Sequence, residues 1–460
     1  MDASGLNLDL IKKYNVQGPR YTSYPTAPQF KEVGEEAVLD LKKCIFKRNQ
    51  EAHQISLYFH IPFCFSLCWY CGCTKVITKD QDRGDIYLDY LENEMDQVKE
   101  LLHPDSKVVQ IHFGGGTPTF LAPDQLTRLG SAIHQRFNTN SKTEFSIEID
   151  PWRCTREHIR VLKSIGCNRA SLGVQDTNPN VQKAIHRIQP YEQTKLVTDW
   201  LREEEIRSIN FDLIYGLPRQ TLATFQQTMN DVLQLKPDRL AVYSYAHIPQ
   251  IMPAQRLLNV NEMPTTDEKL SMLLEAIAHF TGNGFRFIGM DHFSRRDEEL
   301  SQAIDNDSLQ RNFQGYSTLA GADLYGFGMS AISNVGNRYW QNSKEMNEYY
   351  RLLGKSTLPV KRLLHLCKDD LVRKDAIMRI MCRKSLSKSE MEEKWGIDFE
   401  TYFGDALQNL VELERDGLVS INRNEIVITE KGRLFLRNIA ICFDRYLNRG
   451  KTDRNFSKTV

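Results

Sequence analysis

HIPFCFSLCWYCGC, residues 60–73, places four cysteines within ten residues, at positions 64, 68, 71 and 73. The first three, Cys64, Cys68 and Cys71, have the spacing C-x3-C-x2-C. Thiolates are soft ligands that favour iron–sulfur clusters, zinc or copper. Three protein ligands on a cubane iron–sulfur cluster leave one iron free to bind a molecule that is not protein. The spacing therefore predicts a metal centre with an open coordination position.

Other interpretations of these cysteines remain open at this point. Disulfides between such close neighbours would be strained, and Met1–Gly5 lacks the basic start and apolar core of a signal peptide. A zinc site usually combines C-x2-C with a second, distant Cys or His pair, which the sequence does not show. The first three positions also follow helical spacing, so they could form one buried helical face. We favour a cluster over zinc and over simple packing.

The composition is ordinary for a globular protein and argues against several classes. The 460 residues suffice for one large domain or about two to three smaller ones. Hydrophobic residues make up 41% and charged residues 26%, and the net charge is zero, so no overall basic field attracts nucleic acid. No run approaches the roughly 18 apolar residues of a membrane span. Ten cysteines without an export signal predict a cytoplasmic setting. Six scattered cysteines are expected to be buried hydrophobic residues: Cys44, Cys154, Cys167, Cys367, Cys382 and Cys442.

From residue 56 the sequence alternates between short apolar segments and amphipathic segments. Strands rich in Ile, Val, Phe and Tyr are expected at 56–60, 108–113, 145–150, 169–174, 209–215 and 240–245. Helices are expected at 86–103, 123–137, 156–165, 195–205 and 222–235. This alternation predicts an α/β fold in which helical crossovers join parallel strands. Six units indicate a partial (βα)6 TIM-like barrel, although a doubly wound sheet would give the same alternation.

The remaining segments divide the chain into parts. Residues 1–50 are polar and contain the turn-rich run Gly18–Thr26; we expect an ordered N-terminal arm, because its tyrosines need something to pack on. Residues 51–355 form the barrel and its extension. Residues 360–447 have helical segments at 369–382 and 399–415, a hairpin at 417–429 and a helix from 430, a mostly helical, winged-helix-like domain. Its balanced charge favours closing the site over reading nucleic acid. Residues 448–460 are expected to be a flexible basic tail.

Polar and glycine residues follow the ends of the predicted strands, where parallel barrels build their sites. Gly114-Gly115-Gly116 ends the second strand and can expose its backbone to a ligand, but the Lys-Ser/Thr pair of a phosphate-binding P-loop is missing. Glu148 and Asp150 end the third strand, where carboxylates bind ribose hydroxyls or remain solvated. Further polar candidates are Gln175, Arg187 and Asp212, the last inside an apolar strand and therefore in need of a partner. We assign no metal to the histidines His60, His112, His247 and His292.

The C-x3-C-x-aromatic-C loop, the run Gly115-Gly116-Thr117-Pro118 and the six-unit pattern together resemble the radical S-adenosylmethionine (SAM) enzymes. Along nearly its whole length the chain is most similar to the oxygen-independent coproporphyrinogen III oxidase family. Cys73 is typical of that family, is not expected to bind the cluster, and stands where the related haem chaperones carry phenylalanine. The matching segments are 18–26, 60–73, 146–151, 173–176, 211–218, 245–249, 289–293 and 311–316.

The resemblance implies an anaerobic oxidative decarboxylation in haem biosynthesis. Coproporphyrinogen III would become protoporphyrinogen IX as the propionates of rings A and B turn into vinyl groups. A 4Fe–4S cluster on Cys64, Cys68 and Cys71 would bind SAM and cleave it to a 5′-deoxyadenosyl radical, which would abstract hydrogen from the substrate. The family's contacts to this SAM match Tyr58, Gly115, Glu148 and Ile332. Its contacts to a second SAM match Tyr70, Gly116, Thr117, Gln175, Arg187, Asp212 and Ala246. The implied catalytic residues are Tyr58, Glu148, Phe313 and Gln314.

The resemblance also implies a low-potential electron donor of the flavodoxin or ferredoxin type, a monomer, and no nucleic-acid or membrane partner. Three other functions stay open. A haem chaperone or another radical SAM enzyme would not form the vinyl product. A cluster-sensing regulator would bind duplex nucleic acid through residues 360–445 in a salt-sensitive manner. A zinc-stapled structural protein would contain zinc without iron.

Overall fold

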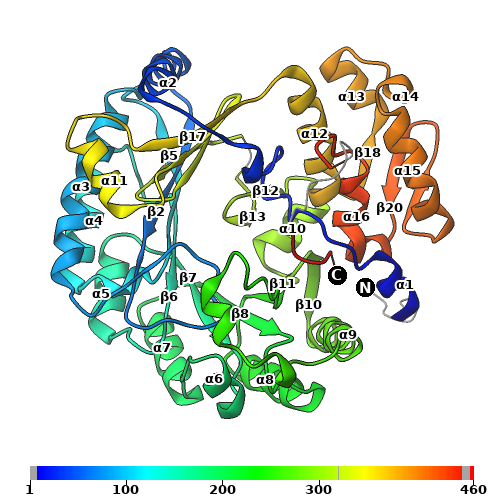
Figure 1. Ribbon diagram of the computed structural model, residues 1–460, viewed down its shortest axis with the longest axis horizontal. Helices are drawn as coiled ribbons and strands as arrows, with labels where there is room; N and C mark the ends of the chain where they lie inside the picture. Colours follow the sequence, from blue (N-terminus) through cyan, green and yellow to red (C-terminus); the bar gives the residue numbers. More distant parts are fainter. Residues whose placement is uncertain (1–7, 320, 448–455, 460) are drawn as a thin grey trace.

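Six parallel strands alternate with helices in the computed structural model, which describes residues 8–319, 321–447 and 456–459 (Figure 1). The strands are β2 (Gln54–Ile61), β5 (Lys107–Gly115), β6 (Glu144–Ile149), β7 (Arg169–Gln175), β8 (Ser208–Tyr215) and β9 (Arg239–Ser244). The helices are α3 (Asp82–Lys99), α4 (Pro123–Arg136), α5 (Arg156–Ser164), α6 (Pro179–Ala184), α7 (Tyr191–Glu203) and α8 (Leu222–Gln234). The expected α/β alternation is confirmed. The first and last residues of each predicted strand lie within two residues of those observed.

The six strands lie in the sheet in their sequence order, β2-β5-β6-β7-β8-β9, and neighbouring pairs are parallel. A doubly wound sheet would reverse its strand order at a switch point, so the partial-barrel alternative is the one observed. The described strands do not close into a full barrel, because the sheet ends at β1 (Lys31–Glu32) and at β10 (Phe285–Gly289). Helices α3 to α8 cover the outside of the curved sheet (Figure 1).

The two faces of the sheet differ in chemistry because successive side chains of a strand point to opposite sides. The outer face packs under the helices with side chains at most 1% exposed: Leu57, Phe59, Ile111, Phe113, Ile147, Leu172, Phe211, Leu213, Leu240 and Val242. The alternate positions are polar and partly exposed: Tyr58, His112, Ser146, Glu148, Ser171, Asn210, Asp212 and Tyr243. The inner face of the curved sheet is therefore a polar surface rather than a packed core.

The sheet continues on both sides of the six units. Next to β2 lies the parallel strand β14 (Asp323–Phe327), followed by the antiparallel strands β15 (Ile332–Val335), β16 (Arg338–Asn342), β17 (Val360–His365) and β1. On the far side, β11 (His292–Arg295) pairs with β9 and with β10. We expected residues 360–365 in the C-terminal domain, but β17 belongs to the large sheet, so the division falls after His365.

The N-terminal segment is more than an arm. Helix α2 (Glu35–Arg48), which we did not predict, buries Val38, Leu41 and Ile45, and β1 joins the sheet. The tyrosines of the turn-rich run are packed as expected, since Tyr21 and Tyr24 are fully buried. Residues 1–50 therefore include both an extended arm and a part of the sheet layer.

The C-terminal domain combines helices with a small antiparallel sheet. Its helices are α12 (Lys368–Cys382), α13 (Lys388–Trp395), α14 (Phe399–Tyr402), α15 (Gly404–Arg415) and α16 (Leu436–Ile441). The sheet has the order β18-β20-β19, with β18 at Ser385–Ser387, β19 at Val419–Ile421 and β20 at Glu425–Ile428. The predicted helix 399–415 is interrupted at Phe403, whose ring contacts Phe443 at 5.2 Å. The mostly helical, winged-helix-like arrangement agrees with the prediction.

A hairpin of β12 (Gln310–Asn312) and β13 (Gly315–Ser317) lies between the inner face of the sheet and α12 (Figure 1). The Tyr316 hydroxyl fixes it to α12 by donating to the Met381 carbonyl at 3.0 Å. The remaining α-helices and strands are α1 (Leu8–Tyr14), β3 (Phe63–Cys64), β4 (Val76–Ile77), α9 (Thr266–Gly282), α10 (Glu299–Asp305) and α11 (Met346–Leu353).

The predicted flexible tail is only partly within the described residues, because 448–455 lie outside them. Residues 456–459 are not a solvated extension: Lys458 bridges to Gln17, and the Thr459 N–H donates to the Val16 carbonyl at 2.7 Å. This segment therefore pairs with the N-terminal arm. In the part of the chain that the structure describes, no helix is both long enough and apolar enough to cross a membrane.

Candidate active site

The cysteine loop and the glycine run after β5 form one structural unit. The Gly116 N–H donates to the Ile61 carbonyl and the Thr117 N–H to the Phe63 carbonyl, both at 2.8 Å. A Cβ atom on Gly116 would lie 2.6 Å from the Pro62 carbonyl oxygen. Only glycine permits this approach. The loop that carries the cysteines is thus held at the carboxyl ends of β2 and β5.

Two side chains donate hydrogen bonds to thiols of this loop. Thr117 Oγ1 lies 3.4 Å from Cys64 Sγ, and Arg187 Nη1 lies 3.7 Å from Cys68 Sγ. Burial raises the pKa of Cys64 to about 12 and also raises the pKa of Cys68, where Arg187 opposes the shift. Donors of this kind stabilise sulfur in its thiolate form, the form that binds metal.

Cys71 differs from the other thiols of the loop because its neighbour Cys73 favours its ionised form. A hydrogen bond from the Cys73 thiol lowers the pKa of Cys71, although burial acts in the opposite direction. The same hydrogen bond raises the pKa of Cys73 well above its ordinary value. The Cys73 N–H also lies 3.5 Å from Cys71 Sγ. In this geometry Cys73 acts as a donor toward Cys71.

The donor set fits an iron–sulfur cluster. Cys64, Cys68 and Cys71 are free, partly buried thiols on one loop. Within the described ranges, no group of three or more Cys, His, Asp or Glu side chains is arranged to hold a single metal ion. A cubane cluster does not require such an arrangement, because each thiolate binds a different iron.

Tyr58, His112 and Glu148 meet on the inner face beside the glycine run. The Tyr58 ring stacks on His112 with centroids 5.8 Å apart, and His112 Nε2 lies 3.5 Å from Glu148 Oε1. Glu148 Oε2 accepts a hydrogen bond from the Gly115 N–H at 3.2 Å, while 45% of its side chain stays exposed. The Tyr58 hydroxyl bonds to His60 Nδ1 at 3.0 Å. Burial raises the pKa of Tyr58 and lowers that of His60, so both side chains are neutral at physiological pH.

Arg187 joins the cysteine loop to the end of β7. Its Nη2 donates to the Gly173 carbonyl at 2.8 Å and to Asp150 Oδ1 at 3.1 Å. Its Nε is buried without a partner among the described residues. Gln175 lies beside this group with a backbone φ of +66°. A Cβ atom on Gly173 would lie 2.7 Å from the side-chain nitrogen Nε2 of Gln175. A buried N–H without an acceptor is costly, so this position is suited to an acceptor atom of a ligand.

Asp212 has the partners that its place in an apolar strand requires. It accepts hydrogen bonds from Ser171 Oγ at 3.0 Å and from Asn210 Nδ2 at 2.9 Å. Burial raises the pKa of Asp212 to about 6, and the negative charge of Glu148 acts in the same direction. The register of the sheet puts Asp212 on the same polar face as Ser171 and Glu148.

The other predicted contact residues form two further groups. Gln255 Nε2 donates to the carbonyl oxygens of Tyr70 at 3.2 Å and Ala246 at 3.1 Å, which links these two positions. Phe313, in the β12–β13 hairpin, makes an edge contact with Tyr339 at 5.8 Å. Ile332 belongs to the same apolar cluster, together with Phe30 of the arm. Both amide atoms of Gln314 are buried without a described partner.

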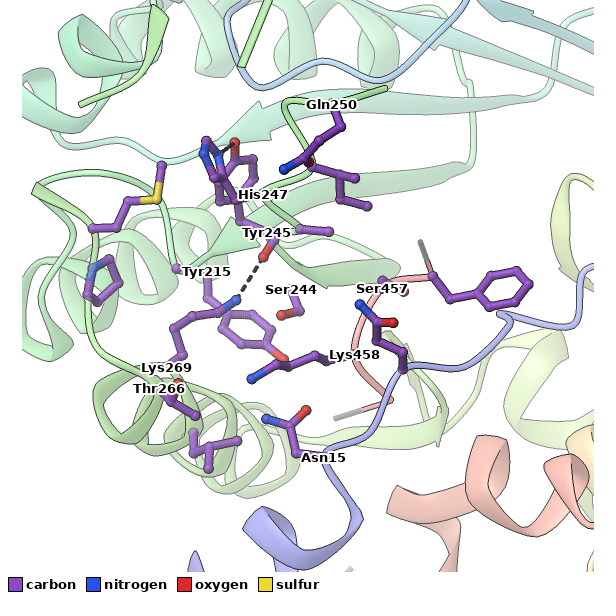
Figure 2. A pocket seen from close by; sticks show the side chains of 18 residues that line it. Asn15, Tyr215, Ser244, Tyr245, His247, Gln250, Thr266, Lys269, Ser457 and Lys458 are labelled. Carbon is purple, nitrogen blue, oxygen red and sulfur yellow. Dashed lines mark hydrogen bonds between the residues drawn. The ribbon is translucent and has the colours of Figure 1, made fainter. Parts of the chain in front are cut away.

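A cavity of about 660 Å³ lies at the carboxyl ends of β8 and β9 and includes Ala246 in its lining (Figure 2). Lys269 from α9, Lys458 from the C-terminal segment and Asn15 from the arm point into this space. Lys269 Nζ donates to the Tyr245 carbonyl at 2.7 Å, and burial lowers the pKa of Lys269 to about 8. The two ends of the described chain therefore supply part of the cavity wall.

Sequence reasoning did not select His60 or His112, although both contact selected residues. The signal that would have found them is the period of two in β2 and β5. Counting in steps of two from Tyr58 reaches His60, and the residues opposite them on β5 are His112 and Gly114. These side chains therefore share the face of Glu148.

Comparison with known protein families agrees with this geometry. The model of the radical SAM superfamily matches residues 58–232, and the model of the HemN C-terminal domain matches residues 366–435. The first match begins in β2 and contains the cysteine loop, the glycine run and Arg187. The parallel sheet, the thiol loop and these matches define a radical SAM protein.

The similarity to individual proteins extends over the whole chain. The oxygen-independent coproporphyrinogen III oxidase of Pseudomonas aeruginosa is 43% identical over 450 residues, which is 97% of each chain. The Escherichia coli K12 protein of the same name is 43% identical over 455 residues, covering 99% of this chain and 98% of its own. The solved structure of the Escherichia coli coproporphyrinogen III oxidase (HemN), a radical SAM enzyme, has a TM-score of 0.90 and covers 96% of this chain and 99% of that one. The chain belongs to the oxygen-independent coproporphyrinogen III oxidase family, and this membership implies a 4Fe–4S cluster and SAM.

Proposed function

We propose that the protein converts coproporphyrinogen III into protoporphyrinogen IX without oxygen, by oxidative decarboxylation of the propionates on rings A and B, in haem biosynthesis. The observation that carries this proposal is the 43% identity over 97% of both chains to an oxygen-independent coproporphyrinogen III oxidase. The site supports it, because the thiol loop opens onto a polar inner face rather than onto a packed core.

We propose Cys64, Cys68 and Cys71 as the cluster ligands. When bound, the cluster and SAM supply the electron and the 5′-deoxyadenosyl radical of this chemistry. Thr117 and Arg187 donate hydrogen bonds to two of the thiols and so favour their ligating form.

Tyr58, Gly115, Glu148 and Ile332 are the proposed contacts to the SAM at the cluster. The half-exposed carboxylate of Glu148 is oriented by the Gly115 N–H and lies next to His112, so it can accept hydrogen bonds from a ligand. We also propose a second SAM molecule. Its contacts would be Tyr70, Gly116, Thr117, Gln175, Arg187, Asp212 and Ala246. Two features support it: the unpartnered Nε of Arg187 and the cavity beside Ala246.

Phe313 and Gln314 are proposed to lie against the substrate, because their hairpin stands between the inner face and the C-terminal domain (Figure 1). The arm and the C-terminal domain would then keep solvent from the site, as radical chemistry requires. All ten cysteines are free, which supports a reducing, cytoplasmic setting and electrons from a low-potential flavodoxin-like or ferredoxin-like donor.

The decisive experiment is an anaerobic product assay. Protein reconstituted with iron and sulfide is mixed with coproporphyrinogen III, SAM and a strong reductant, and porphyrins are separated after oxidation. We expect protoporphyrin, with 5′-deoxyadenosine and methionine as co-products. Cleavage of SAM without any vinyl product would instead support a haem chaperone or another radical SAM enzyme, and would contradict the proposal.

A further inference from the structure

A group of buried polar atoms without partners lies where β11 meets the β12–β13 hairpin. Within the described residues, no hydrogen-bond partner exists for Nε and Nη1 of Arg311, for Nδ1 of His292, or for either amide atom of Gln314. Arg311 is only 8% exposed. A buried charge with unused donors is strongly unfavourable unless something else satisfies it. Three such side chains on β11 and the adjoining hairpin indicate a place where a polar ligand can bind.

The register of the strands places this group on the polar inner face. His292 on β11 pairs with Ala241 on β9, and Ala241 pairs with Asp212 on β8. The ring of Tyr316 connects the hairpin to this face: it lies 5.3 Å from His292 and 4.6 Å from the Arg311 guanidinium. Arg311 therefore stands over the same polar face as Asp212, on the side of the face formed by β9 and β11.

Two other arginines nearby are already engaged. Arg20 of the arm forms an ion pair with Asp291 and lies over the Tyr243 ring at 5.4 Å. Arg437 gives its donors to backbone carbonyls, including that of Pro19 at 3.0 Å. Burial, and then the charge of Arg20, lower the pKa of Arg437 to about 9. Arg311 is the member of this group of three whose buried guanidinium donors have no partner among the described residues.

The chemistry of the group is that of a carboxylate receptor. A guanidinium group offers a planar pair of N–H donors that matches the two oxygens of a carboxylate. Burial and the charges of Arg311 and Arg20 lower the pKa of His292 well below its ordinary value, so its imidazole is neutral and can add one N–H. The Gln314 amide can add two more.

We propose that Arg311, with His292 and Gln314, binds a propionate carboxylate of the porphyrinogen. This inference rests on the proposed function, which supplies a substrate with several propionates. SAM also carries a carboxylate. β11 is six strand spacings from β2, after which the cysteines follow, which separates Arg311 from a SAM bound at the thiol loop. The second proposed SAM, with Asp212 of β8 among its contacts, is the alternative that the separate SAM titration tests. A propionate held at Arg311 orients a wide macrocycle over the inner face relative to the thiol loop.

The test compares Arg311→Gln, Arg311→Lys and the wild type as anaerobically reconstituted holoenzymes. Binding of coproporphyrin III, which keeps the propionates but does not react, is followed by fluorescence titration, and SAM is titrated separately. The matched control is Arg415→Gln, which removes an exposed guanidinium at the end of α15. Iron content and thermal unfolding are recorded for every variant.

We expect Arg311→Gln to weaken coproporphyrin III binding by about 10- to 100-fold, the usual range for a charged hydrogen-bonded pair. KM for coproporphyrinogen III should rise by a similar factor, and SAM binding should stay unchanged. Arg311→Lys keeps the charge without the planar fork and should fall between Gln and wild type. Arg415→Gln should behave as wild type.

Two outcomes would overturn the inference alone: wild-type porphyrin binding in a well-folded Arg311→Gln protein that turns over substrate, or weakened SAM binding with unchanged porphyrin binding. A wild-type enzyme that neither binds coproporphyrin III nor forms product refutes the proposed function as well. If Arg311→Gln does not fold, the test uses the wild-type protein instead and follows its histidine side chains by NMR. Coproporphyrin III must then shift the His292 signal, whereas SAM alone must not, and the opposite pattern refutes the inference.

Discussion

Arg187 connects three parts of the site through one guanidinium group. It reaches the Cys68 thiol, the Asp150 carboxylate and the Gly173 carbonyl, and still has a buried Nε without a described partner. A single side chain thus couples the cysteine loop to the ends of β6 and β7. Loss of this residue is expected to disturb the thiol environment and ligand binding together.

The roles of Cys68 and Cys73 can be separated by substitution. Cys68→Ala removes one of the three proposed cluster ligands and should abolish both iron binding and turnover. Cys73→Ala removes only a donor to Cys71, so the protein should keep its iron and sulfide. Metal analysis and the visible absorption of anaerobically reconstituted proteins measure the difference.

The control for this pair is Cys44→Ala, which changes a partly buried thiol on α2 outside the loop. It should match the wild type in iron content. Loss of iron from Cys73→Ala at wild-type folding stability would show that the assignment of three ligands is wrong.

Single residues were predictable from the sequence where chemistry and position coincide. Three thiols in one loop and a carboxylate at a strand end stand out, and Cys64 and Glu148 were identified in this way. His112 was not, because one histidine between apolar neighbours looks like a core residue until the register puts it beside Glu148. Arg311 was hidden for a related reason: its lack of partners exists only in three dimensions.

Helix α3 is joined to the part of the sheet that contains β14 to β16 through one buried carboxyl group, that of Glu94. It accepts hydrogen bonds from the Gly328 N–H at 2.8 Å, the Tyr349 hydroxyl at 2.7 Å and Asn342 Nδ2 at 2.6 Å. Burial raises the pKa of Glu94 to about 7, although the three donors favour its ionised form. The turn after β14, the end of β16 and helix α11 are thereby fixed to α3.

Glu94→Ala is expected to lower the free energy of unfolding by about 3 kcal/mol, because buried donors lose their acceptor. Urea unfolding followed by circular dichroism measures the change. Lys99→Ala is the matched control, since Lys99 is exposed on the same helix. An effect of Glu94→Ala no larger than that of the control would show that the carboxyl group does not hold these elements together.

Whole elements were predictable where apolar periodicity was regular. The six strands and five of the helices between them follow this rule. The strands β14 to β16 do not: β14 has every residue buried and contains Asp323 and Gly326, which are uncommon in strands. Beyond β15, strand β16 buries Gln341 and Asn342 through hydrogen bonds. Helix α2 does show helical spacing of Val38, Leu41 and Ile45, but its polar surroundings concealed it.

At the scale of the whole molecule, the N-terminal arm joins parts that are far apart in sequence. Arg437 of α16 donates to carbonyls of both the arm and residues 457–458. The Tyr21 hydroxyl donates to Asp444, also near the C-terminal end. The Tyr24 carbonyl accepts a hydrogen bond from Tyr339 of β16 at 3.2 Å. The arm thus spans from the C-terminal domain to the large sheet.

The arm can act in two ways, by covering the site or by supporting the fold, and a deletion distinguishes them. The cysteine loop is bonded to the residues that follow β5 and to Ile185 after α6, none of which lies in the arm. Deleting residues 1–26 should therefore leave the iron content near that of wild type. Turnover of coproporphyrinogen III should fall by roughly 100-fold. The deletion removes the ion pair of Arg20 with Asp291 and the segment that covers the site, so the substrate is less well positioned.

The control deletion of residues 1–7 keeps every described contact and should leave turnover unchanged. Iron content and product formation, measured on the same preparations, decide between the roles: a parallel fall in both would mean that the arm supports folding and not the cover of the site.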